Sequence, residues 1–285
     1  MRIDSPAEVR RSAGAHRTDE LPFTGRQPDH VPGHWVLARL GKRVLRPGGR
    51  SLTETMVAAA CVTDADVVEL APGLGLTAGI ILKYGPRSYT GVEAEARAAA
   101  IVERAIGARG RVVNGNAKQT GLADASADVV LNEAMLTMNA PAMKDAIIAE
   151  AWRVLRPGGR YAIHELALIP DTIADDVVAT IYRSLSRSIL VNSRPLTIAG
   201  WRALLAAHGF EIEQVVTAPM ALLTARRVLA DEGFWRTLRI GGRLLCDAAL
   251  RTRVARMRRT FTAHRESIAA MAIIARKPSD AERTR

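Results

Sequence analysis

The segment from Val67 to Thr77 most constrains what this chain of 285 residues can fold into. It reads Val-Val-Glu-Leu-Ala-Pro-Gly-Leu-Gly-Leu-Thr, an apolar run that carries an acid, Glu69, and passes into a turn of small residues. A second apolar run ends at another acid, Glu93. Glycines let a backbone approach a ligand closely, and an acid after the second strand can accept hydrogen bonds from ribose hydroxyls. The pattern predicts an open α/β sheet with a crevice for a nucleoside cofactor.

The glycine pattern alone fits either a dinucleotide or S-adenosylmethionine (SAM). The composition is that of an ordinary globular protein, with 48% hydrophobic and 24% charged residues. No apolar run approaches the roughly 18 residues of a membrane span, and the first residues lack the apolar stretch of a signal peptide. We therefore expect a cytoplasmic protein with no membrane span.

Cysteine and histidine content predicts no metal centre. Cys61 and Cys246 have apolar neighbours, so we expect reduced, packed thiols. The six histidines show no paired spacing of the kind that metal ligands have, and no metal site is predicted.

The net charge of +11 invites a nucleic-acid interpretation. The densest basic run comprises Arg251, Arg253, Arg256, Arg258 and Arg259, which alternate with small and apolar residues. This alternation favours one solvated face of a helix over a phosphate-binding surface. Nucleic acid is therefore the less favoured partner.

The order of apolar runs predicts three regions. Residues 1–30 are polar and are expected to form a flexible N-terminal arm. Residues 31–62 are expected to form a helical cap, with helices over 34–45 and 52–61. Residues 63–285 are expected to form the cofactor-binding domain, with a helical insertion at about 220–264.

Within that domain, continuous apolar strands alternate with helices, which favours a parallel sheet covered on both faces. The octapeptide Arg-Val-Leu-Arg-Pro-Gly-Gly-Arg occurs at 43–50 and again at 153–160. Both copies are interpreted as helix C-termini, because glycine and proline end helices. The strands are expected at 67–70, 88–92, 111–113, 127–131, 161–164, 210–217 and 268–275.

Five segments between about 65 and 168 together resemble the class I SAM-dependent methyltransferase family. Glu69 to Gly75 resembles the family's acid-x-Gly-x-Gly-x-Gly loop, with Ala71 in place of the first glycine and Pro72 after it. Alanine is tolerated there if its φ is negative, and proline rigidifies the turn. Glu93 resembles the acid that binds ribose.

The other three segments follow in the family's order. Residues 114–117, Asn-Gly-Asn-Ala, stand where the family has Gly-Asp-Ala beside the adenine, with Asn116 in place of the acid. Residues 125–130 resemble the entry to the fourth strand, and residues 153–159 resemble the turn before the fifth.

The resemblance implies a Rossmann-like sheet of seven strands, mostly parallel with the last antiparallel and with helices on both faces. It also implies methyl transfer from SAM. The implied cofactor-binding residues are Glu69, Ala71, Pro72, Gly73, Gly75, Glu93, Asn116, Ala117 and Asn132.

Two residues near the strand ends are candidates for catalysis. His164 is the first candidate base, because an unperturbed imidazole titrates near neutral pH. Glu133 is placed to lie against the methionine part of SAM or to bind a cationic acceptor. Each side chain has an equally good structural interpretation, as a packed histidine and a capping carboxylate. Glu165 is expected to face away from His164 on the same strand.

The acceptor pocket is expected where the chain least resembles the family. His34 and Trp35 of the cap are candidate substrate-binding residues, as is Arg194, which is suited to clamping an anionic acceptor. Phe234 and Trp235 in the insertion are further candidates for the pocket wall. A homodimer through apolar helix faces stays open.

These features favour methyl transfer to a small-molecule acceptor, with the acceptor atom (oxygen, nitrogen or carbon) undetermined. An RNA or DNA methyltransferase is the alternative that the charge suggests, and a non-catalytic protein with a SAM fold is another. Against the nucleic-acid alternative, residues 132–135 lack the Asn/Asp-Pro-Pro-aromatic segment used to grip a flipped base. A nicotinamide dehydrogenase fits the later segments poorly.

Overall fold

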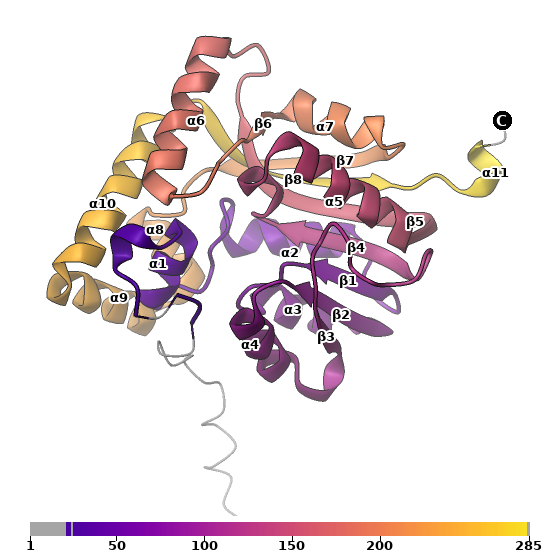
Figure 1. The fold of residues 1–285 in the computed structure, drawn as a ribbon, viewed down its shortest axis with the longest axis horizontal. Coiled ribbons are helices and arrows are strands. Elements are labelled where there is room, and N and C mark those ends of the chain that lie inside the picture. Colours follow the sequence, from indigo (N-terminus) through magenta and orange to yellow (C-terminus); the bar gives the residue numbers. More distant parts are fainter. Residues whose placement is uncertain (1–20, 24, 284–285) are drawn as a thin grey trace, which may run out of the picture.

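A mostly parallel sheet forms the centre of the molecule (Figure 1). The computed structural model describes residues 21–23 and 25–283, so most of the predicted N-terminal arm lies outside the described residues. The strands are β1 (Asp66–Leu70), β2 (Ser88–Glu93), β3 (Arg111–Asn114), β4 (Ala127–Glu133), β5 (Leu155–Leu168), β6 (Leu196–Thr197), β7 (Glu211–Pro219) and β8 (Ile268–Arg276).

The strand order is β3-β2-β1-β4-β5-β8-β7, and the short strand β6 pairs with β5 beside this path. Strands β1 to β5 are parallel to one another, whereas β8 is antiparallel to both β5 and β7. The sheet predicted from the sequence is confirmed; β6 was not predicted.

Helices cover both faces of this sheet (Figure 1). One face packs against α5 and α7 through residues such as Ile147 and Trp201, and the other packs against α2, α3 and α4 through residues such as Met56 and Val102. The helices are α1 (Gly33–Arg39), α2 (Gly49–Ala59), α3 (Leu76–Ile81), α4 (Ala96–Ile106), α5 (Pro141–Val154), α6 (Asp175–Ile189), α7 (Ile198–Ala207), α8 (Ala225–Glu232), α9 (Phe234–Cys246), α10 (Ala248–Ala263) and α11 (Asp280–Arg283).

A third apolar cluster joins helices from the N-terminal and C-terminal parts of the described chain. Trp35 of α1, Ile181 of α6, Ile240 of α9 and Met257 of α10 are all buried in it. Arg253 is also buried here, and its guanidinium donates to the carbonyl oxygens of residues 28, 31 and 188. The insertion at 220–264 is helical as predicted, and it packs with α1, whereas α2 packs on the sheet.

Three expectations about local structure are wrong. Cys61 and Cys246 are exposed rather than packed. Arg253 is buried and so does not belong to the solvated face of α10, which carries its four neighbours in the basic run. The octapeptide copy at 43–50 leads into α2 instead of ending a helix, because α1 already ends at Arg39.

The register of the parallel strands brings three distant segments to one edge of the sheet. Leu70 pairs with Val92 of β2 on one side and with Asn132 of β4 on the other. The residues that follow, Glu93 and Glu133 among them, therefore meet at the carboxyl ends of the strands, where open α/β sheets bind ligands. No helix within residues 21–23 and 25–283 is long and apolar enough to cross a membrane.

Candidate active site

A cavity of about 470 Å³ lies between the carboxyl ends of the central strands and the helices of the third cluster. Its floor is formed by residues 71–74, 93–95 and 133–135, which follow β1, β2 and β4. Its roof comes from segments near both ends of the described chain, and includes Phe23, His34, Trp35, Leu222, Met257 and Phe261. The cavity is therefore a crevice of the sheet closed by the cap and the insertion.

The loop after β1 has left-handed backbone at three positions. Ala71, Gly73 and Gly75 have φ values of 55°, 59° and 70°. The negative φ at which alanine is tolerated is therefore not found at Ala71, and an alanine in this conformation stores about 1 kcal/mol of strain. A Cβ built on Gly73 would meet no side chain, only the carbonyl oxygen of Ala71 at 4.0 Å. The backbone at Gly73 is thus open to a ligand.

Glu93 connects this loop to the end of β2. Its Oε2 accepts a hydrogen bond from the amide of Gly73 at 3.0 Å, and its Oε1 accepts one from the amide of Glu95 at 3.1 Å. Both Gly73 and Glu93 line the cavity. The carboxylate is consequently held at the rim of the loop with lone pairs left for a ligand.

Glu69 is the acid of β1 and lies deeper in the cavity floor. Its side chain is almost fully buried, and Oε2 accepts a hydrogen bond from the hydroxyl of Tyr89 at 2.7 Å. Burial raises the pKa of Glu69 to about 8, against the opposing effect of the Tyr89 hydrogen bond. In the absence of a cation, this carboxyl is protonated at neutral pH.

Glu133, at the end of β4, is the centre of a buried polar network. Its Oε2 binds the Arg46 guanidinium and the Thr77 hydroxyl, and its Oε1 accepts from Thr53 at 2.5 Å and lies 2.7 Å from Nδ1 of His164. Burial raises the pKa of Glu133, but Arg46 and these hydrogen bonds outweigh it and bring the pKa to about 2. Glu133 is therefore an anion held by four partners, and a poor base.

His164 is fully buried behind Glu133 and lies outside the cavity wall. The amide of Gly48 donates to its Nε2 at 3.2 Å, so we assign the ring proton to Nδ1, which then donates to Glu133. Both ring nitrogens are occupied within the protein. The structure thus gives His164 a positioning role and corrects its choice as the candidate base.

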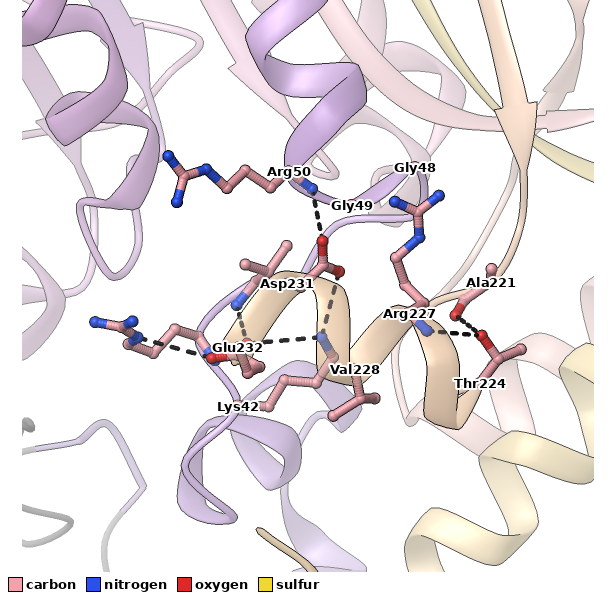
Figure 2. Close-up of polar contacts among 12 residues, drawn as sticks. Lys42, Gly48, Gly49, Arg50, Ala221, Thr224, Arg227, Val228, Asp231 and Glu232 are labelled. Atoms are coloured by element: carbon pink, nitrogen blue, oxygen red, sulfur yellow. Dashed lines mark hydrogen bonds and ion pairs between the residues drawn. The ribbon is translucent and has the colours of Figure 1, made fainter. Parts of the chain in front are cut away.

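Arg46, which binds Glu133, belongs to the segment 42–50. Figure 2 shows how Asp231 and Glu232 of α8 hold both ends of this segment. Glu232 Oε1 accepts from the amides of Arg43 and Val44 at 2.7 and 2.8 Å, and Asp231 Oδ1 accepts from the amide of Arg50 at 3.1 Å. The ammonium of Lys42 lies between the two carboxylates, 4.0 and 3.7 Å from them. The insertion thereby fixes the segment that carries Arg46.

Four predicted cofactor residues lie outside the cavity wall. Asn132 is buried beneath it, donating to Glu165 at 3.1 Å and accepting from the Tyr161 hydroxyl at 2.6 Å. Asn116 is exposed and accepts from the amide of residue 118, and Ala117 is half-buried. Gly75 also lies outside the wall, and its left-handed backbone begins α3.

Some of the predicted substrate residues line the cavity and others lie outside it. His34 and Trp35 line the roof of the cavity, with ring centroids 5.1 Å apart. Burial lowers the pKa of His34 to about 4, so its imidazole is neutral at pH 7. Arg194 is exposed outside the cavity and lies over the ring of Tyr182, which contradicts the predicted clamp. Phe234 and Trp235 are also exposed on the surface.

The sequence interpretation missed the residues that hold Glu133. Arg46 belongs to the repeated octapeptide, and that repeat was attributed to helix ends, so its guanidinium was overlooked. Thr53 and Thr77 lie on α2 and α3 and carry no recognisable motif. Within the part of the chain that the structure describes, no group of His, Cys, Asp and Glu residues is placed to hold a metal ion.

Comparisons with known proteins agree with this geometry. A family model described as "Methyltransferase domain" matches residues 68–163. A Haemophilus influenzae protein described as "Uncharacterized protein" is 34% identical over 252 residues, which cover 86% of this chain and 98% of that protein. A "Putative O-methyltransferase" of Mycolicibacterium vanbaalenii is 31% identical over 193 residues, which cover 60% of this chain and 83% of that protein.

A solved structure shares the fold. Phosphoethanolamine N-methyltransferase 2 of Haemonchus contortus, in complex with SAM, is 15% identical to this chain. The likeness has a TM-score of 0.63 and covers 87% of this chain and 56% of that one. At this identity the likeness shows the fold alone.

Proposed function

The chain belongs to the class I SAM-dependent methyltransferase family, and we propose that it methylates a small, largely apolar molecule. The observation that carries this proposal is the cavity, which joins an acidic floor at the strand ends to an apolar roof. A volume of about 470 Å³ is in the range of about 300–1,000 Å³ that small-molecule sites occupy. The O-methyltransferase name of one relative is compatible with a hydroxyl acceptor.

The floor of the cavity fits SAM. The open backbone at Gly73 leaves room for the cofactor beside the loop, and Glu93 has free lone pairs for its ribose hydroxyls. Glu93 and Glu95 make the floor acidic, which suits a sulfonium cation, and a cation bound there would favour ionisation of Glu69 as well. When bound there, SAM supplies an electrophilic methyl group. We propose that residues 71–74 and Glu93 hold it.

The roof of the cavity fits an apolar acceptor. Phe23, Trp35, Leu222, Met257 and Phe261 line it, and none of these side chains carries a charge. Such walls exclude water and hold the acceptor in one orientation, which is the main contribution a protein makes to a displacement reaction. An anionic acceptor is disfavoured, since Arg194 is outside the cavity, while Arg46 and Arg43 in its wall are paired with Glu133 and, at 3.7 Å, with Glu232.

His34 is our candidate for the group that accepts a proton from a hydroxyl acceptor. Its imidazole lines the roof and is neutral at pH 7, so it can accept a proton; because burial lowers its pKa to about 4, it is a weak base and takes the proton only as the methyl group is transferred. Glu133 has a pKa of about 2 and four partners, which makes it an unsuitable base. His34 and the Glu133 network therefore have separate roles: the first touches the acceptor, and the second fixes the floor.

The test is methyl transfer from radiolabelled SAM to a panel of neutral phenols and apolar alcohols, with transfer RNA and DNA as competing acceptors. We expect label in the small apolar hydroxyl compounds. Label only in nucleic acid would contradict the proposal and favour the alternative that the net charge of +11 suggests. No transfer to any compound, with SAM bound, would favour a non-catalytic protein.

A variant pair tests the role of His34. His34→Asn is expected to lower kcat by about 100-fold or more while SAM affinity is kept, since general-base catalysis contributes about 10²–10⁴-fold. His30→Asn, at an exposed position four residues earlier, is the matched control. Equal activity in the two variants would remove His34 from the reaction.

A further inference from the structure

The outer surface of α9 carries a stripe of large apolar side chains that face solvent. Phe234, Trp235, Leu238 and Leu245 are 62%, 78%, 60% and 78% exposed. Helical periodicity places Phe234, Leu238 and Leu245 in one line along the helix, with Trp235 at its side. Large exposed apolar surfaces on a protein mark sites that bind a partner or a membrane.

The opposite face of α9 packs against residues that form the roof over the active site. Ile240 is buried in the third cluster together with Trp35 and Met257, and those two residues line the cavity. Figure 1 shows α8, α9 and α10 together at the end of the molecule opposite α11. The exposed stripe therefore lies on the outside of the layer that closes the cavity.

The insertion is strongly basic on its outer surface. Residues 220–264 contain ten arginines and three acidic residues. Asp231 and Glu232 turn inward, with side chains 2% and 0% exposed, and bind Lys42 and backbone amides before and in the first turn of α2 (Figure 2). The third acid, Asp247, accepts from the amide of Leu250 at the start of α10. The acids are engaged within the fold, so the surface charge is positive.

Two of these arginines lie beside the apolar stripe. Arg239 is exposed on α9 and follows Trp235 by one helical turn. Arg251 of α10 donates to the carbonyl oxygens of Leu244 and Leu245, both at 3.0 Å, which places its guanidinium at the far end of the stripe. Apolar side chains flanked by arginines are typical of helices that lie in a lipid headgroup region.

We propose that α9 docks this protein on the surface of an anionic lipid bilayer. The helix has 13 residues, too few to span a bilayer, and it lies in the interface with Trp235 and the leucines inserted among the headgroups. A second copy of the chain is the weaker occupant, because pairing two such faces would gather the flanking arginines of both copies in one interface. A nucleic acid would satisfy the arginines but leave the apolar stripe in water.

The docking surface is tested by co-sedimentation of the full chain with vesicles. We expect binding to vesicles of equal parts phosphatidylcholine and phosphatidylglycerol, at least tenfold stronger than to pure phosphatidylcholine, and weaker as salt is raised. The double variant Trp235→Ser/Leu238→Ser is expected to bind at least tenfold more weakly, because it removes apolar area from the lipid. Val177→Ser, at an exposed apolar residue of α6, is the matched control.

A pair of variants that reverse the charge of one arginine gives an independent test. Arg239→Glu is expected to weaken binding to the anionic vesicles by about fivefold or more, since one arginine near such a surface contributes about 1 kcal/mol. Arg202→Glu on α7 is the matched control and is expected to bind as the parent chain does. All the substituted side chains are exposed, and circular dichroism with thermal melting verifies that each variant is folded.

Three results would overturn the proposal. The first is absence of binding of the parent chain to the anionic vesicles. The second is equal binding by the Trp235→Ser/Leu238→Ser variant and its control. The third is a dimer, seen by light scattering, that this double variant converts to a monomer, because a second copy would then be the occupant of the stripe.

Discussion

Replacing Glu69 by glutamine should stabilise the protein without SAM, and the gain should grow with pH. Burial raises the pKa of Glu69 from 4.5 to about 8. Above pH 4.5 the unfolded chain ionises this carboxyl while the folded chain keeps it protonated, so the parent loses stability as pH rises and the loss levels off above about pH 8. Glutamine does not ionise, and its amide oxygen can still accept from Tyr89.

The size of the effect follows from the pKa difference. Each pH unit between the two pKa values costs about 1.4 kcal/mol, so the advantage of Glu69→Gln should increase by about 3 kcal/mol between pH 5 and pH 7. Burying the new amide group costs a free energy that does not depend on pH. This cost lowers the stability of the variant equally at pH 5 and at pH 7, so the increase of about 3 kcal/mol is unchanged. The assay is urea unfolding of the parent and the variant at several pH values.

A control variant and the proton release on SAM binding complete this test. Glu103→Gln, at an exposed position of α4, should show no pH-dependent gain over the parent. A cation bound beside Glu69 should favour its ionised form, so SAM binding at pH 7 should release protons, measurable by calorimetry in buffers of different ionisation enthalpy. A gain for Glu69→Gln that is independent of pH would refute the assignment of a raised pKa to this carboxyl.

Further predictions concern the network below the cavity and the cofactor loop. Arg46→Met should destabilise the protein by about 3–5 kcal/mol, because it leaves the Glu133 carboxylate buried without its cation. Adding Glu133→Gln should recover part of that loss in urea unfolding, and a double variant no more stable than Arg46→Met would contradict the network. Ala71→Gly should stabilise the protein by about 1 kcal/mol, because φ at this position is 55°. An unchanged or lowered midpoint of thermal unfolding would show that the left-handed alanine is not strained.

The sheet was predictable because its signals are local. Apolar runs such as 67–70 and 127–131 are separated by turns and helices, and their order fixes which carboxyl ends share an edge. The acids Glu69, Glu93 and Glu133 follow from the same runs, since each lies in or at the end of a strand. The structure places all three in the cavity floor.

The parts that escaped prediction depend on contacts between distant segments. Arg46 meets Glu133 across 87 positions of sequence, and Glu232 meets Arg43 across 189. His164 was placed near the right edge of the sheet, but alternation of side chains along β5 turns it away from the cavity while Glu165 faces it. Arg194 is a similar case, because the sequence shows a cation suited to binding an anion, whereas the direction of its side chain depends on Tyr182, twelve residues earlier.

The central claim is that the loop after β1 and Glu93 form a SAM site, and calorimetric titration tests it most directly. The parent chain should bind SAM and S-adenosylhomocysteine and show no heat with NADH. Glu93→Ala should weaken SAM binding by about 1–3 kcal/mol in a folded protein, because a charged acceptor for the ribose is lost. Failure of the folded parent to bind either adenosyl ligand, or unchanged affinity in Glu93→Ala, would contradict the account.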